Sequence, residues 1–178
     1  MKACKIYKGA IIVNGSFVFE MLGGDFSTFA KGAYKRLGID YPKFFKMDAL
    51  SKLAFLGVEY LLEGFSSEEK EGLALVFANH SASLDTDLRH QETIQDPNNY
   101  YPSPAIFVYT LPNICLGEIA IRHGLRTESS FFIFDQYPSE FFSQYSQYLL
   151  QAGKAKKVLC AWVELIAEDY CLTINIME

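Results

Sequence analysis

Residues 73–81 read LALVFANHS, an apolar run that ends in small polar residues. A strand of this composition is typical of a sheet that is buried on both faces. Apolar stretches also occur at 130–135 and 157–166, and segments with helical spacing lie between them. Strands that alternate with helices in this way favour a mostly parallel sheet.

The rest of the chain fits the same pattern. Asn14-Gly15 favours a hairpin turn between two short strands in residues 7–20. Apolar residues from 50 to 62 follow helical spacing; Asp48 can cap this helix and Gly64 can end it. Further expected elements are a short helix near 27–36, helices over 86–95, 110–124 and 139–152, and a last strand over 170–177. We therefore expect one α/β domain, residues 1–178, with a mostly parallel five-stranded sheet covered by helices on both faces.

Composition excludes several classes of function. Half of the 178 residues are hydrophobic and the net charge is −5, which favours neither disorder nor a nucleic-acid-binding surface. The sequence shows no signal-like start and no apolar run of membrane-spanning length, so we expect a cytoplasmic protein. Its four cysteines have no CxxC spacing and are expected to be reduced. With 15 Phe and 11 Tyr, part of the aromatic surface is expected to lie under a partner.

A metal site is the first candidate for chemistry, because several possible ligands crowd together. No HExxH-like pair occurs among them, so we expect a solvated helix, no metal and no cofactor. The residues concerned are His80, Asp85, Asp87, His90 and Glu92.

The sequence offers little evidence for a catalytic nucleophile. The turn after strand 130–135 is Asp135-Gln136-Tyr137 rather than GxSxG, and no histidine follows His123. Cys115 and Cys160 lie inside apolar segments, where thiols are usually inert. Phosphate-binding glycine motifs are absent from the sequence.

Four segments carry a family resemblance: ANHSASLDTDLRHQETI, YPSPAIFVYTLPNICLGEIAIRHGLR, QYLLQAGKAKKVLCAWVE and, upstream, KMDALSKLAFLGVEYLL. In order and spacing, residues 72–164 resemble the N-terminal half of the β-ketoacyl-ACP synthases, condensing enzymes of the thiolase-like superfamily. The pattern SPA..VYTLPN...GEIAIRHGLR is fairly specific, whereas residues 1–40 match weakly. The resemblance implies half of a thiolase-like fold.

By this resemblance, Gln136 stands at the position of the condensing cysteine. The interval from 124–126 to 151–153 has the length found in the family. There the cysteine lies at a helix N-terminus, where the helix dipole favours the thiolate. A glutamine amide cannot form the thioester, so we expect no condensing activity from this chain alone, although it resembles an acyltransferase family.

Glutamine at this position is typical of chain length factors, the non-condensing partners of ketosynthases, and of decarboxylating synthase domains. Decarboxylation also requires two histidines from HGTGT-like and NxxFGFGG-like segments, which this sequence does not contain. A truncated, chain-length-factor-like subunit is therefore the leading interpretation. A plainer alternative is that Gln136 caps the helix expected at 139.

The resemblance also implies two contact regions. In the family, the strand equivalent to 130–135 pairs with its mate in the other subunit; here it is apolar, an edge that invites pairing. Its residues are Ser130, Phe131, Phe132, Ile133, Phe134 and Asp135. A loop at 105–109 is implied to reach the partner's acyl pocket, with Ala105, Ile106, Phe107, Val108, Tyr109 and Asn113 near it.

We therefore expect a partner of a full-length ketosynthase in fatty acid or polyketide biosynthesis, including the aryl polyene type. Lysines in AGKAKK and PKFFKMDALSK could also receive an acidic acyl carrier protein. A second hypothesis is a homodimer through strand 130–135 that binds an acyl chain or carrier protein without catalysis. A third is an enzyme with another nucleophile.

Overall fold

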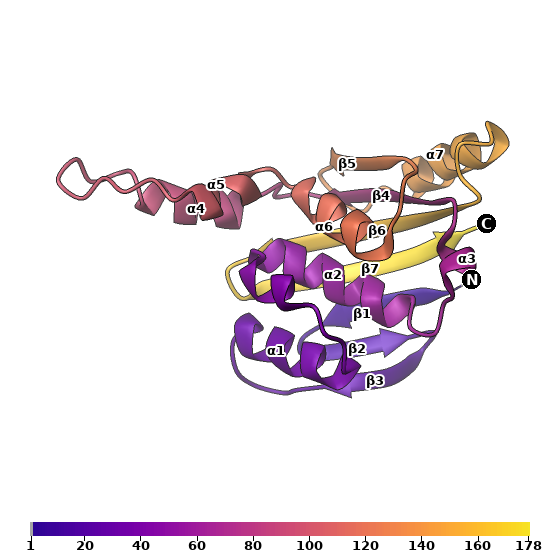
Figure 1. The fold of residues 1–178 in the computed structure, drawn as a ribbon, viewed down its shortest axis with the longest axis horizontal. Coiled ribbons are helices and arrows are strands. Elements are labelled where there is room, and N and C mark those ends of the chain that lie inside the picture. Colours follow the sequence, from indigo (N-terminus) through magenta and orange to yellow (C-terminus); the bar gives the residue numbers. More distant parts are fainter. Residues whose placement is uncertain (1) are drawn as a thin grey trace.

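The computed structural model describes residues 2–178, and its centre is one mixed sheet (Figure 1). The sheet has seven strands in the order β3-β2-β1-β7-β6-β4-β5. The strands are β1 Ala3–Tyr7, β2 Ala10–Val13, β3 Ser16–Glu20, β4 Leu73–Asn79, β5 Ser129–Ile133, β6 Lys157–Ile166 and β7 Asp169–Met177. β4 is buried along its whole length, as its apolar sequence predicts.

The expectation of a mostly parallel, five-stranded sheet is wrong. Within residues 2–178, the parallel pairings are limited to those of β4, with β5 on one side and β6 on the other. β6 and β7 are joined by a tight turn at 167–168, too short for the crossover that parallel strands need, so they pair antiparallel. β1, β2 and β3 form two successive hairpins. The Asn14-Gly15 turn is confirmed, with positive φ at both residues.

Helices cover both faces of the sheet, unequally. They are α1 Phe26–Leu37, α2 Ala49–Leu61, α3 Ser67–Lys70, α4 Leu84–Glu92, α5 Pro104–Phe107, α6 Ile114–His123 and α7 Ser139–Gln151, with short 3-10 turns η1 Pro42–Lys46 and η2 Val108–Thr110. α1, α2 and α6 contribute to a large core on one face. α7 forms a smaller core with β4 and β6 on the other face.

α2 is the central helix of the larger core and is buried nearly throughout. It begins as predicted, because the Asp48 side chain accepts a hydrogen bond from the backbone N–H of Ser51 at 2.9 Å. Gly57 lets the helix approach the sheet closely: a Cβ there would lie 2.6 Å from a methyl group of Leu172 on β7. Each fully buried leucine or phenylalanine in this core contributes about 1.5–3 kcal/mol of transfer free energy.

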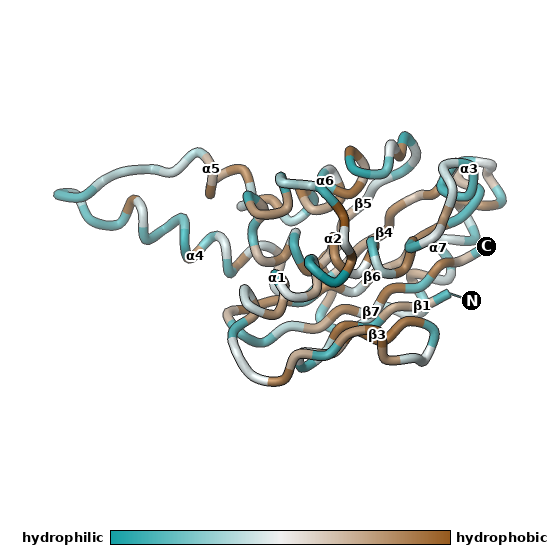
Figure 2. The backbone as a smooth tube through the Cα atoms, turned by 60° about the horizontal axis from the view of Figure 1, so that its bottom comes forward, coloured by the Kyte–Doolittle hydropathy of each residue, from teal (hydrophilic) through white to brown (hydrophobic). Residues whose placement is uncertain are grey.

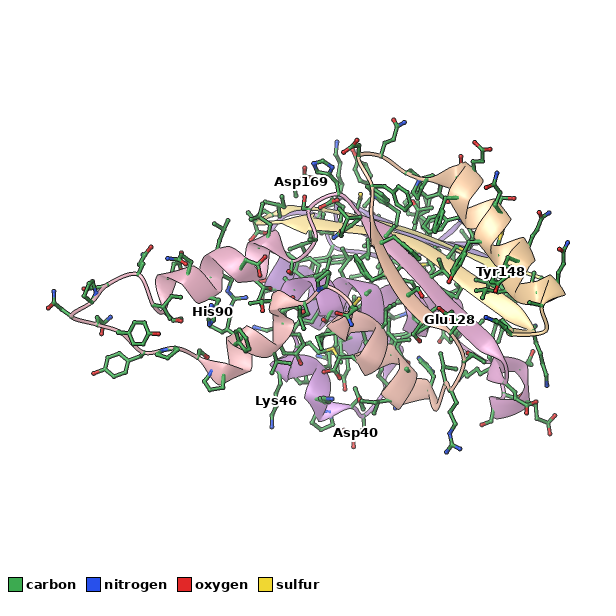
Figure 3. The ribbon with its side chains drawn as sticks, turned by 90° about the horizontal axis from the view of Figure 1, so that it is seen from above. Asp40, Lys46, His90, Glu128, Tyr148 and Asp169 are labelled. Carbon is green, nitrogen blue, oxygen red and sulfur yellow. The ribbon has the colours of Figure 1, made fainter. Side chains whose placement is uncertain are left out.

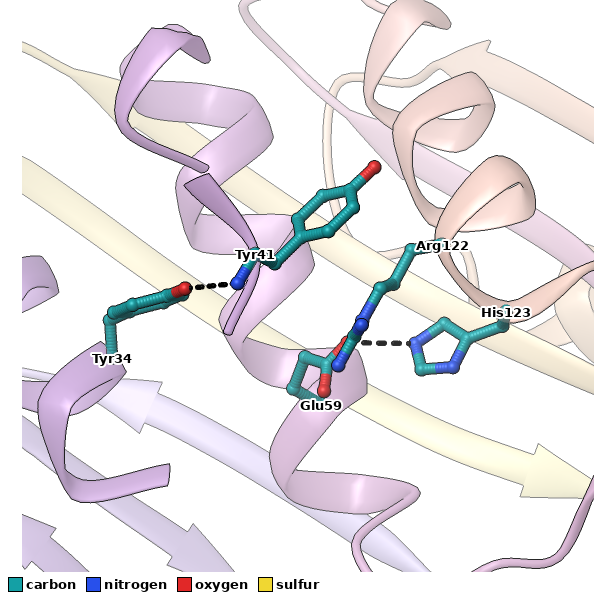
Figure 4. Close-up of polar contacts among 5 residues, drawn as sticks. All are labelled: Tyr34, Tyr41, Glu59, Arg122 and His123. Carbon is teal, nitrogen blue, oxygen red and sulfur yellow. Dashed lines mark hydrogen bonds and ion pairs between the residues drawn. The ribbon is translucent and has the colours of Figure 1, made fainter. Parts of the chain in front are cut away.

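Polar contacts join α2 to α6 (Figure 4). Glu59 Oε1 accepts a hydrogen bond from Arg122 Nε at 2.8 Å, and His123 Nε2 lies 3.2 Å from the same oxygen. Nearby, the Tyr34 hydroxyl accepts from the backbone N–H of Tyr41 at 2.6 Å. Burial would raise the pKa of Glu59, but the close contacts with His123 and Arg122 outweigh it and lower that pKa below its ordinary value.

Residues 84–107, here called the arm, project from the body of the molecule (Figures 1 and 3). The arm consists of α4, an extended tip and α5. Figure 2 shows that α4 and the tip are mostly hydrophilic and that the chain becomes hydrophobic near α5. Thr86 is the only buried residue of the arm. The arm therefore has no apolar core of its own.

All four cysteines are free thiols; Cys4, Cys115 and Cys160 are buried and Cys171 is half-buried. Within residues 2–178, no single helix has the length and apolar character needed to cross a membrane. One pair, Pro104–Thr110 with Ile114–His123, meets that length and composition only when its two members are taken together, and it is bent by 97°.

Candidate functional site

Gln136 lies in the turn between β5 and α7 and is exposed to solvent. β5 runs parallel to β4, and the backbone N–H of Phe134 still donates to the Asn79 carbonyl at 3.0 Å. The turn is therefore at the carboxyl ends of the parallel strands, the edge where α/β proteins commonly bind ligands. Residues 134–141 line an open depression of about 450 Å³ around it.

The expectation that Gln136 caps the following helix is wrong. α7 has Pro138 at its N-cap position and no side-chain hydrogen bond there. Two residues separate Gln136 from the first residue of α7, and its amide is exposed rather than folded back on the helix. The glutamine side chain is thus free of a structural role at this helix terminus.

β5 is an edge strand, shorter than expected. It spans Ser129–Ile133 instead of 130–135, with Asp135 beyond the last ladder contact. The strand begins where its backbone first pairs with β4, at Ser129 opposite Leu75. Its other side has no neighbouring strand in the sheet of residues 2–178.

The backbone N–H and C=O groups of successive residues point to alternate sides of β5, which identifies those on its open side. The Glu128 carbonyl accepts from the Leu75 N–H at 2.9 Å, and the Phe134 N–H points to β4 as well. Even-numbered residues of the strand thus bond to β4, and the N–H and C=O groups of the odd-numbered residues face outward. Those residues are Ser129, Phe131 and Ile133.

Aromatic side chains flank this edge on the α7 face. The ring centroids of Phe132 and Phe141 lie 4.7 Å apart, and those of Phe134 and Phe141 lie 5.0 Å apart. The Phe141 ring also stacks on Tyr145 at 5.4 Å. These rings hold β5 and α7 together while remaining only partly buried. The edge is therefore flanked by aromatic rings on the α7 face and open on its outer side.

The segment 105–109 is helical rather than a loop, because Ser103 caps it and Pro104 occupies the first turn. Phe107 and Val108 point to solvent, with 61% and 49% exposure. Ala105 is exposed too, Ile106 is half-buried, and Asn113 is exposed at the start of α6. That these residues line an acyl pocket stays a prediction.

Tyr109 differs from its neighbours because it points inward. It is 9% exposed, and its hydroxyl donates to Glu118 Oε1 at 2.9 Å. Lys43 Nζ lies 2.8 Å from the other oxygen of Glu118. Burial, followed by the bond to Glu118, raises the pKa of Tyr109. This buried network attaches η1 and η2 to α6.

The possible metal ligands in residues 80–92 serve structural contacts instead. Asp85 Oδ1 accepts from the backbone N–H of Ala167 at 2.9 Å, and His90 packs against Phe107 with centroids 5.4 Å apart. Among residues 2–178, no group of three or more His, Cys, Asp or Glu side chains has the arrangement of a metal site.

Sequence reasoning missed the polar residues at the root of the arm. Asn79 is fully buried, and Asp48 was expected only as a helix cap. Asn79 ends an apolar strand, and a polar residue at such a position is the signal that could have identified it. The bond from Thr86 to Asp48 crosses 38 residues of chain and leaves no local pattern.

Comparisons with known proteins rest on structure. No family model matches the sequence, and no curated protein matches it either. A chain of the ishigamide ketosynthase/chain length factor matches with a TM-score of 0.69 and 15% identity, over 99% of this chain and 61% of that one. This protein thus spans about three-fifths of that chain.

Two further solved structures have the same fold. One is a ketosynthase, ApeO, in complex with its chain length factor, ApeC, from Xenorhabdus doucetiae, with a TM-score of 0.65 and 16% identity over 100% of this chain and 77% of that one. The other is the oxazolomycin ketosynthase domain OzmH KS8 of Streptomyces albus JA3453, with a TM-score of 0.55 and 9% identity over 98% and 45%. The chain therefore has the fold of proteins found in ketosynthase and chain length factor assemblies, as its sequence resemblance implies.

Proposed function

We propose that this protein is a non-condensing, chain-length-factor-like subunit that pairs with a full-length ketosynthase in the cytoplasm. The pair would assemble polyketide or fatty acyl chains, including the aryl polyene type. The fold supports this proposal, because its structural neighbours come from ketosynthase and chain length factor assemblies.

The chemistry of Gln136 supports a non-condensing role. An amide cannot carry the acyl thioester that a condensing cysteine forms. The buried cysteines offer no substitute: burial raises the pKa of Cys4 to about 12 and that of Cys160 to about 11, which keeps both thiols protonated. The acyl chain would therefore be bound to the partner's nucleophile.

The observation that carries the proposal is the open edge of β5. The backbone N–H and C=O groups of Ser129, Phe131 and Ile133 face outward and pair with no strand of residues 2–178, and the Ile133 side chain is 52% exposed. Exposed apolar edges promote association unless they are covered. We place the ketosynthase on this edge, where its own edge strand would continue the sheet.

The arm supplies the second contact in this arrangement. Five of its large apolar side chains are 44 to 74% exposed, because the arm has no core to bury them. Apolar side chains on a projecting element are typical of a surface covered by a partner. They are Leu84, Leu88, Tyr100, Tyr101 and Phe107. Phe107 and Val108 would line the shared acyl tunnel and limit chain length.

An acyl carrier protein would be a further, acidic partner. In η1, Lys46 is exposed, whereas Lys43 is partly committed to Glu118. We therefore place more weight on Lys46 than on Lys43 for carrier recognition.

Co-expression with the ketosynthase encoded nearest to this protein tests the proposal. Size-exclusion chromatography with light scattering should show a one-to-one complex. Ile133→Lys should weaken that complex about tenfold or more, because it places a charge in the β5 interface. Phe17→Lys is the matched control: Phe17 is 69% exposed on β3, at the opposite edge of the same sheet, and its substitution should leave binding unchanged.

Two results would contradict the proposal. The first is separate elution of the two wild-type chains with this protein as a stable homodimer, which would favour the homodimeric scaffold that binds acyl groups or carrier proteins. The second is equal loss of binding in both lysine variants, which would remove β5 as the interface. If the complex forms, Phe107→Ala should lengthen the product chains measured by mass spectrometry.

A further inference from the structure

The arm is attached to the body by polar bonds rather than by apolar packing. Its tip is stabilised internally, for example by the Tyr101 N–H donating to the Thr93 carbonyl at 2.9 Å. At its root, the Ser83 hydroxyl donates to the Thr110 carbonyl at 2.7 Å and so joins the two segments that flank the arm. A small set of hydrogen bonds therefore lies at the root, where the arm meets the body.

The first root contact holds a strained turn. Ala82 has a φ of 49°, in the left-handed region that residues with a Cβ seldom adopt. Asn79 clamps this residue, since its Nδ2 donates to the Ala82 carbonyl at 2.8 Å and its Oδ1 accepts from the Ala82 N–H at 3.0 Å. A strained backbone conformation of this kind persists only where several surrounding contacts hold it in place. The chain thus leaves β4 in one fixed direction.

The second root contact joins α4 to α2. Thr86 Oγ1 donates to Asp48 Oδ2 at 2.8 Å, and the two residues are 2% and 8% exposed. The other oxygen, Oδ1, caps α2 through Ser51. One buried carboxylate therefore holds a body helix with one oxygen and the arm with the other.

This bond lies beside a half-open pocket of about 120 Å³ between arm and body, lined by Asp48, Thr86, Arg89, Ile106 and Tyr109 among others. Burial raises the pKa of Asp48 despite its hydrogen bonds. A buried carboxylate is stabilised by each hydrogen-bond donor that replaces its lost contacts with water.

We propose that Asp48 is a positioning residue that sets the direction of the arm through the hydroxyl of Thr86, so that the arm is oriented before a partner binds. Its consequence for partner binding rests on the proposed function; the attachment of the arm does not. If the arm is already oriented in the free protein, binding does not carry the entropy cost of ordering it, and the affinity for the partner is higher.

Hydrogen exchange measured by mass spectrometry on the full chain tests this proposal. Thr86→Val keeps the shape of the side chain but removes the donor, and it should speed exchange in residues 84–90 about tenfold while α2 stays protected. Thr86→Ser restores a hydroxyl and should return exchange to the wild-type rate. Thr93→Val is the matched control, because Thr93 Oγ1 donates within the arm, to the His90 carbonyl at 2.7 Å.

Affinity for the ketosynthase provides the second readout. Thr86→Val should weaken the complex about fivefold to tenfold, and Thr86→Ser should recover it. Failure of the wild-type chain to bind would refute the proposed function, yet exchange would still decide the role of Asp48. Unchanged exchange in Thr86→Val, no rescue by Thr86→Ser, or loss of α2 protection together with the arm would overturn the positioning role.

Discussion

The substitution Tyr109→Phe tests whether the hydroxyl of Tyr109 stabilises the fold or whether Tyr109 serves only the proposed acyl tunnel. The tyrosine hydroxyl donates to Glu118 Oε1 at 2.9 Å, and Glu118 is 5% exposed. The substitution leaves that carboxylate oxygen buried with one donor fewer. Hydrogen bonds to charged groups contribute about 1.5–3 kcal/mol, so the free energy of unfolding should fall by about that amount. For a chain of this length, the melting temperature should fall by about 3–12 °C.

Urea unfolding followed by circular dichroism measures the effect. Tyr100→Phe is the control, because Tyr100 is 59% exposed on the arm and the same chemical change should cost less than about 0.5 kcal/mol there. Phe107→Ala, at an exposed site, should be equally mild. A Tyr109→Phe variant as stable as the wild type would refute the reasoning, since the hydroxyl would then not belong to the buried network.

Two further predictions concern the larger core. Gly57→Ala should destabilise the protein by about 1–3 kcal/mol, because the new methyl group would press on Leu172. Gly117→Ala on α6 should stabilise it by about 0.5–1 kcal/mol, because a Cβ there meets no atom within 4 Å. A higher melting temperature for Gly57→Ala than for Gly117→Ala would contradict this. Glu59, whose pKa is lowered in the folded state, contributes stability that is present above its ordinary pKa of 4.5 and is lost as the pH falls through the folded value. Glu59→Gln should therefore destabilise the protein at pH 7, and its free energy of unfolding should depend less on pH in the acid range. If urea unfolding shows the same pH dependence as for the wild type, the contacts of Glu59 with Arg122 are not the source of that dependence.

Much of the candidate site could be predicted from local pattern. The apolar strand, the turn and the helix around Gln136 follow from composition and spacing. The orientation of Tyr109 could not be predicted, because its partner Glu118 lies on another element and the two meet only when η2 packs on α6. The role of Asp48 at the arm root was hidden for the same reason, because its partner Thr86 is 38 residues away in the chain.

The sequence by itself determined the elements and one chemical exclusion. Hydrophobic periodicity located the buried strand β4 and the helix that Asp48 caps, Asn14-Gly15 specified a hairpin, and a glutamine at position 136 excluded a thioester there. Tertiary structure alone decided the order and direction of the strands, because pairing depends on connection length and on contacts between distant segments. It also decided that β5 is an open edge and that polar bonds hold the arm: both depend on which surfaces remain uncovered after packing, and no local pattern records that.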